Sequence, residues 1–218
     1  MKIKEIYPGL YHIKFKSQYL MAMTFLRVQE YYESEWAEIR GTYFPLEDYM
    51  DLYAKQNGNF TYPLDWDGFN IPGEVYNKWA KLFWQYPNMM AKEIDLYNKL
   101  LPIINKKSKF YLISSRDKKC LKHEIAHGFY YLNSKYKRAI NKLLNPRTKF
   151  YRDFKKKLLS MGYCKNVIKD EIQAYCVDEN FKDLVDSKNI EDNKKNQKIV
   201  DKIKKIYNKH TKKVNYEI

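Results

Sequence analysis

Cysteine is scarce in this sequence of 218 residues. The three that occur, Cys120, Cys164 and Cys176, are odd in number, and no two have the spacing of a CxxC pair. This pattern argues against a disulfide framework and a structural zinc knuckle, and it favours a reducing compartment. The thiols are best read as buried or idle groups, with metal ligation by Cys176 as the minor alternative.

Long apolar runs are also missing. The longest apolar stretch, residues 19–26, is interrupted by Thr24 and ends at Arg27, so it is far too short to cross a bilayer. No basic N-terminal segment is followed by an apolar run, which predicts that there is no signal peptide. We therefore expect a cytoplasmic protein without a membrane partner, and a viral origin is compatible with the same features.

Acidic residues are too few to balance the lysines and arginines, and the chain carries a net charge of +15. Residues 1–100 carry 11 Lys and Arg against 13 Asp and Glu, whereas residues 101–218 carry 30 against 13. A basic half of this kind can bind nucleic acid or an acidic partner. The alternative is a compositional bias that enriches Lys, Asn, Ile and Tyr together, and the scarcity of Arg, the better bidentate phosphate ligand, favours it.

Apolar residues make up 44% of the chain and aromatic residues 17%, which argues against disorder. Apolar positions recur mostly at helical spacing, while residues 11–16 alternate and residues 109–115 form a β-compatible run. The sequence thus predicts an α+β, predominantly helical single domain with a small sheet. We expect a domain over 1–186, divided into a helical part (about 1–105) and a metal-site part (about 106–186), and then a basic tail, 187–218, with a mobile linker before a terminal amphipathic helix.

Local signals refine this expectation. Residues 60–73 mix aromatics with Asp, Asn, Gly and Pro, which predicts an ordered loop rather than a helix or strand. That loop either lines a binding site or is pinned to the core by Trp66 and Phe69. Pro102 is expected to end a helix over 89–101, and residues 163–168 are expected to form a short strand.

The segment 122–128, with the sequence KHEIAHG, carries the clearest chemical signal. On a helix predicted over about 118–132, His123 and His127 lie on one face, because residues i and i+4 are stacked. Glu124 lies about 100° further round, where a carboxylate can act on water beside a metal ion. Two histidines held by hydrogen bonds, without a metal, are the structural alternative.

A hydrolytic zinc site needs a third protein ligand. No third histidine follows at a short distance, since Tyr and Asn stand at positions 131 and 133. The best candidate is Glu171, with Asp170 and Glu179 as alternatives; Asp170 also suits a helix N-cap. If 171–178 is helical, Glu171, Tyr175 and Asp178 share a face, and Tyr175 can point its hydroxyl at the site.

The His-Glu-x-x-His pattern, with a strand before it and Glu171 after it, resembles the zincin metallopeptidases of the gluzincin type over about 65 residues. The resemblance implies one zinc ion, with His123 and His127 as the first two ligands, Glu171 as the third and Glu124 as general base. It also implies that the strand at 109–114 lies at a sheet edge and pairs with an extended peptide substrate.

These observations predict a zinc metallopeptidase that cleaves a peptide or amide bond, with Tyr175, Tyr130 or Arg116 stabilising the oxyanion. Two other readings remain open. The chain can be a non-catalytic zincin-derived binding or regulatory module, or a basic viral or nucleic-acid-associated protein that retains a structural metal site. The substrate and the oligomeric state do not follow from the sequence.

Overall fold

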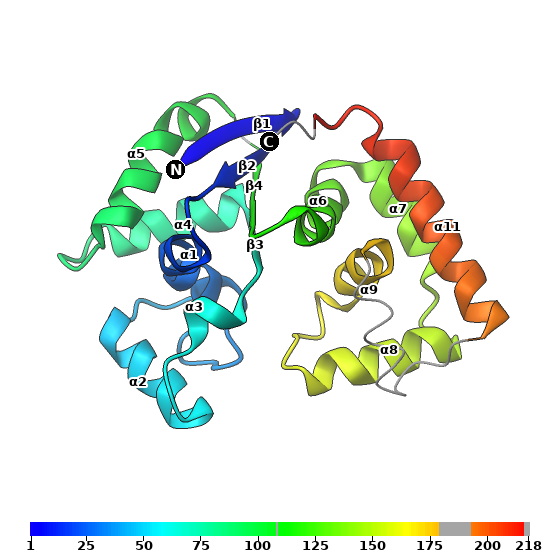
Figure 1. The fold of residues 1–218 in the computed structure, drawn as a ribbon, viewed down its shortest axis with the longest axis horizontal. Coiled ribbons are helices and arrows are strands. Elements are labelled where there is room, and N and C mark those ends of the chain that lie inside the picture. The colour runs from blue at the N-terminus through cyan, green and yellow to red at the C-terminus, as the bar shows by residue number, and fades with distance from the viewer. Residues whose placement is uncertain (108, 179–192, 216–218) are drawn as a thin grey trace. The chain divides into compact units, whose positions relative to one another are not determined.

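The computed structural model describes residues 1–107, 109–178 and 193–215, which form predominantly helices and one small mixed sheet (Figure 1). This confirms the predicted α+β class. The chain divides into two compact units, Met1–Asp117 and Lys118–Ile218. Within the described ranges, no helix combines the length and the apolar character that crossing a membrane requires.

The first unit contains four strands and five helices in its described part. They are β1 (Lys2–Tyr7), β2 (Leu10–Lys14), α1 (Gln18–Glu33), α2 (Leu46–Asn57), α3 (Tyr62–Asp65), β3 (Gly68–Pro72), α4 (Gly73–Phe83), α5 (Ala91–Lys106) and β4 (Tyr111–Ser115). The described part of the second unit is helical, with α6 (Lys118–Leu132), α7 (Ser134–Leu143), α8 (Lys149–Ser160), α9 (Ile168–Val177) and α11 (Lys194–Thr211). The division places β4 in the first unit, whereas we expected it in the metal-site part.

The strand before the metal helix is not an edge strand, and this part of the prediction is wrong. The sheet order is β1-β2-β4-β3, with β4 parallel to β2 and antiparallel to β3. Both sides of β4 are therefore occupied by neighbouring strands. A central position suits its buried residues Tyr111–Ser114, because a strand that is apolar on both faces gains most inside a sheet. Strand addition by a substrate is consequently not available at β4.

We expected the aromatic segment 60–73 to be an ordered loop, and this prediction is wrong. The segment contains α3 and β3, and β3 pairs with β4 through the register Phe69↔Ser114 and Ile71↔Leu112. Phe69 and Ile71 are buried in the core of the first unit. Burial and ladder hydrogen bonds outweigh the turn signals of the intervening Asp, Asn and Gly residues, which locate the bends but not the strand.

Two further local predictions fail for similar reasons. Pro102 lies inside α5, which continues to Lys106, because Leu100 and the half-buried Ile103 and Ile104 keep the helix packed on the core. Residues 163–168 do not form a strand: residues 165–167 form a turn, and Ile168 begins α9. The N–H groups of Tyr163 and Val167 donate to the carbonyls of Leu158 and Cys164. These local bonds engage two of the N–H groups that a strand ladder would use.

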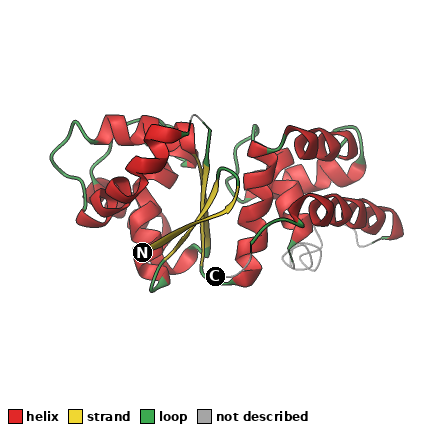
Figure 2. Ribbon diagram, turned by 90° about the horizontal axis from the view of Figure 1, so that it is seen from above, coloured by secondary structure: helices red, strands yellow, loops and turns green. Residues whose placement is uncertain are grey.

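Helices α1, α4 and α5 lie on one side of the sheet, and the core of the first unit fills the space between them (Figure 2). Within this core, Arg27 of α1 pairs with Glu93 of α5, and both side chains are fully buried. Arg27 Nε donates to Glu93 Oε1 at 2.8 Å, and Nη2 also donates to the carbonyl of Asn88 at 2.9 Å. Glu93 also accepts a hydrogen bond from the backbone N–H of Met90 at 2.8 Å, and it thereby caps the N-terminus of α5.

The substitution Arg27→Met leaves the Glu93 carboxylate buried without its partner. We expect the free energy of unfolding to fall by about 3–5 kcal/mol in urea titrations, whereas the double variant Arg27→Met/Glu93→Leu should recover most of the loss. Lys99→Met, which breaks the exposed pair with Asp95, is the control and should cost less than about 1 kcal/mol. Equal losses for the buried and exposed pairs would contradict this account.

Candidate metal centre

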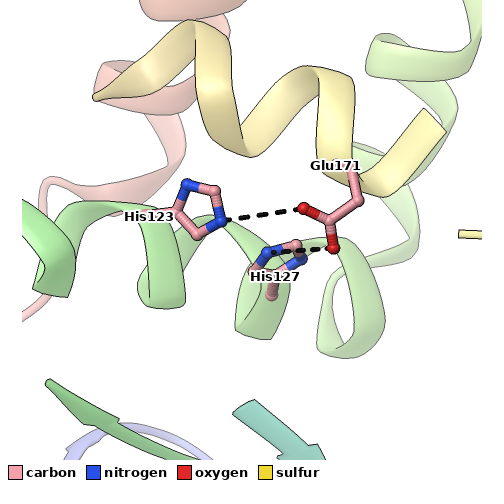
Figure 3. Close-up of side chains that lie close together, drawn as sticks. All are labelled: His123, His127 and Glu171. Carbon is pink, nitrogen blue, oxygen red and sulfur yellow. Dashed lines mark ion pairs between the residues drawn. The ribbon is translucent and has the colours of Figure 1, made fainter. Parts of the chain in front are cut away.

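Two helices of the second unit build the candidate metal centre. Helix α6 has the predicted bounds, and its Leu121, Ile125 and Phe129 are buried. Helix α9 packs against α6 and brings Glu171 opposite the two histidines (Figure 3). The structure thus brings His123, His127 and Glu171 together, although Glu171 comes 44 positions after His127 in the sequence.

The three side chains face one another through the atoms that bind metals. His123 Nε2 lies 3.8 Å from Glu171 Oε2, and His127 Nε2 lies 3.7 Å from Glu171 Oε1 (Figure 3). One potential ligand atom from each residue lies within 4.8 Å of the others. Tetrahedral zinc with bonds of about 2.0–2.1 Å holds its ligand atoms about 3.3 Å apart, so the widest separation in the cluster must shorten by about 1.5 Å to seat the ion.

Buried polar atoms without partners point to the same position. His127 Nε2 and Glu171 Oε2 are buried and have no hydrogen-bond partner among the described residues. Such orphaned atoms cost free energy unless an ion or water satisfies them. Both belong to the predicted ligand set, and the residues present therefore fit a divalent cation.

A carboxylate holds the other ring nitrogen of each histidine. His123 Nδ1 lies 2.8 Å from Asp178 Oδ2, and His127 Nδ1 lies 2.9 Å from Asp170 Oδ1. Because a carboxylate only accepts, each neutral ring donates its Nδ1–H and directs the lone pair of Nε2 towards Glu171. Outer carboxylates of this kind fix the tautomer and the orientation of metal-binding histidines.

These outer partners differ from the expected roles. Asp170 is not the N-cap of α9, because the helix begins two residues earlier and Val167 occupies that position. Its carboxylate instead meets His127 and accepts from Gln173 Nε2 at 2.9 Å. The role of Asp178 was not predicted: the sequence only places it on the face of Glu171 if 171–178 is helical, whereas the structure ends α9 at Val177 with Asp178 as its C-cap. Glu179, the other alternative ligand, lies outside the described residues.

The charges of the cluster shift its pKa values. Burial by itself would lower the pKa of His127, but the carboxylates of Asp170, Glu171 and Glu124 raise it well above its ordinary value. Burial also opposes the charged form of His123, yet its bond to Asp178 and the charges of Glu124 and Glu171 raise its pKa. Burial raises the pKa of Glu171, and the two histidines oppose that shift. The site therefore favours positive charge.

Glu124 and Tyr175, the predicted catalytic residues, both lie beside this cluster. Glu124 is 6% exposed, and its charge acts on both histidines and on Glu171. The ring of Tyr175 meets that of His123 edge-on, with centroids 4.9 Å apart, and its hydroxyl lies 3.0 Å from that of Tyr163. Burial raises the pKa of Tyr175, so its hydroxyl stays protonated at neutral pH.

The other two candidates for oxyanion stabilisation have partners elsewhere. Tyr130 donates its hydroxyl to Asn141 Oδ1 at 2.8 Å, on α7. Arg116 belongs to the first unit and pairs with Asp67 at 2.8 Å. Among the three residues considered, Tyr175 is the one whose contact with a candidate metal ligand the structure shows.

Comparisons with protein-family models, with curated proteins and with solved structures find no match for this chain. The chemical argument therefore depends on the geometry of the site.

Removal of a ligand or of an outer carboxylate should separate their roles in metal affinity. We expect Glu171→Gln to weaken zinc binding by more than about a hundredfold, and Asp178→Asn by about 10–100-fold, in competition titrations with a chromogenic chelator. Asp153→Asn, a carboxylate on α8 that pairs with Lys149, is the control and should bind zinc as the wild type does. Wild-type affinity in the Glu171→Gln variant would contradict the three-ligand arrangement.

Proposed function

We propose that this protein is a zinc-dependent hydrolase, a metallopeptidase of the gluzincin kind that cleaves a peptide or amide bond. One observation carries the proposal. The buried Nε2 of His127 and Oε2 of Glu171, which lack hydrogen-bond partners among the described residues, converge with His123 Nε2, while outer carboxylates hold both histidines from behind. This donor set, two imidazoles and one carboxylate, is that of hydrolytic zinc sites with an open position.

In this proposal, His123, His127 and Glu171 hold one Zn²⁺. When bound, the ion supplies Lewis acidity that polarises a scissile carbonyl and acidifies water. Glu124 takes a proton from the attacking water and delivers it to the leaving amine as the C–N bond breaks. Its near-complete burial supports this role, because low solvent exposure strengthens its electrostatic interaction with the reacting groups.

Tyr175 is proposed to donate its hydroxyl to the oxyanion that develops on the substrate carbonyl. Its ring already contacts His123, and its raised pKa keeps the donor protonated. The bond between Tyr175 and Tyr163 must then exchange for one to the substrate. A single donor of this kind contributes roughly 10²–10³-fold to the rate in other hydrolases.

The partners of the proposed enzyme are a peptide or protein substrate. A cytoplasmic location is the companion proposal, supported by three cysteines that form no disulfide.

A structural role for the metal is the second candidate. It is favoured by the low exposure of the cluster, since His127 is 2% exposed and Glu171 4%. An ion there would brace α6 against α9 without meeting a substrate, as in a zincin-derived binding or regulatory module. The two candidates differ in what Glu124 does, because a brace needs no general base.

The substitution Glu124→Gln separates these candidates. If the protein is an enzyme, hydrolysis of peptides in a proteome-derived library, read by mass spectrometry, should fall by at least about a thousandfold while zinc content stays at one ion per chain. Glu74→Gln, an exposed glutamate on α4, is the control and should cleave as the wild type does. A zinc-loaded wild type that cuts no peptide in the library would support the structural brace instead.

The variant Tyr175→Phe tests the oxyanion role. We expect kcat to fall roughly 10²-fold with zinc affinity and KM little changed, because the lost bond forms mainly in the transition state. Tyr163→Phe removes the partner hydroxyl but leaves Tyr175 in place, so its kcat should remain within a few-fold of wild type. Equal losses in both variants would assign Tyr175 a packing role.

A further inference from the structure

Helices α7 and α11 pack against each other on the outside of the second unit. Both have buried apolar or neutral residues on the inner side; on α11 these include Val200, Ile203 and Tyr207, and on α7 Tyr136 and Ile140. The opposite sides are exposed and basic, and the metal centre makes no use of them.

On α11 the exposed side carries a regular row of lysines. Positions 195, 198, 202, 205 and 209 are all Lys and all exposed. Their spacing of three and four residues keeps them on one side of the helix, opposite the buried residues. At a rise of 1.5 Å per residue, the row is about 21 Å long, with neighbouring charges about 5 Å apart along the axis.

Helix α7 repeats the pattern with Lys135, Arg138 and Lys142, which are exposed at the same spacing. The two rows meet at one end. His210 of α11 contacts the ring of Tyr136 of α7, and Asn133 lies 3.4 Å from His210 Nδ1. The charges of Lys209 and Lys135 both act on the His210 ring, whose pKa is lowered by partial burial and by these two neighbours.

Little on these helices offsets the eight positive charges. Asp201 is the one acidic residue in the sequences of α7 and α11, and it lies at the side of the row, where it accepts from Gln197 at 2.9 Å. Within the described part of the chain, the ion pairs of Lys and Arg all involve other residues. So dense a charge without compensation disfavours the folded state and is retained more readily where a partner binds it.

The face also lacks the features that other anionic partners use. None of the large apolar side chains exposed among the described residues lies on α7 or α11, and Tyr136 and Tyr207 are buried. A membrane surface normally requires apolar residues that insert beside the lysines. Single-stranded nucleic acid normally requires exposed aromatic side chains on which bases stack.

We propose that the exposed face of α7 and α11, formed by Lys195, Lys198, Lys202, Lys205 and Lys209 with Lys135, Arg138 and Lys142, binds double-stranded nucleic acid through its phosphate backbone. A duplex carries one charge per about 1.7 Å, so a row of about 21 Å runs beside about a dozen phosphates. Seven of the eight residues at the face are lysines, which bind phosphate as point charges rather than reading bases, and the binding is therefore independent of sequence.

The test uses the full chain, fluorescence anisotropy and labelled 20-bp DNA and RNA duplexes of mixed sequence. We expect the triple variant Lys198→Gln/Lys202→Gln/Lys205→Gln to reduce the slope of log K against log salt by about 3. Affinity should fall on the order of a hundredfold at 0.15 M salt, at about 0.9 counterion per lost contact. A loss of affinity for both duplexes, or for one of them, supports the proposal and shows whether the face binds DNA, RNA or both.

The control removes the same charge elsewhere. Lys55→Gln/Lys78→Gln/Lys81→Gln changes three exposed lysines of the first unit and should bind the duplex as the wild type does. Equal loss in both triple variants would overturn the proposal, because net charge alone would then explain the binding. It would also be overturned by no duplex binding at 0.15 M salt, or by tighter binding to poly-glutamate or to phosphatidylserine vesicles than to either duplex.

Discussion

The contact between α6 and α9 is the constraint on which the second unit depends. It brings the buried His127 and the half-buried His123 together with the carboxylates of Glu124, Asp170, Glu171 and Asp178, and such a cluster is costly to remove from water. Hydrogen bonds to both Nδ1 atoms offset part of that cost, but Nε2 of His127 and Oε2 of Glu171 have no hydrogen-bond partner among the described residues. A divalent cation at the point where they converge would satisfy both atoms and neutralise the excess of negative charge.

The precision of this arrangement comes from helices rather than loops. The histidines lie four residues apart on α6, Asp170 and Glu171 lie in the first turn of α9, and Asp178 is the C-cap residue directly after that helix, so the two helices set the positions of these groups. Asp178 meets the first histidine and Asp170 the second, and Glu171 faces both from between them. A shift of one residue in α9 would turn its carboxylates by about 100° and separate every one of these pairs.

In the second unit, negative and positive side chains occupy different places. Acidic side chains gather around the histidines in the interior, whereas the outer sides of α7 and α11 are almost wholly basic. The interior cluster suits a small cation, and the outer face suits an extended anion. These features use different residues, so the proposed hydrolysis and the proposed duplex binding can be gained, lost and measured independently of each other.

Local patterns alone determined much of this protein: the bounds of α6, the shared face of His123 and His127, and the α+β class. Each depends on periodicity, which acts over a few residues and is written directly in the chain. Only the tertiary structure decided that β4 lies inside its sheet, that residues 68–72 form a strand, and that Asp170 and Asp178 hold the histidines. Those outcomes depend on which distant segments meet. Packing rather than local spacing decides which strands pair and which of the 26 acidic residues contacts each histidine.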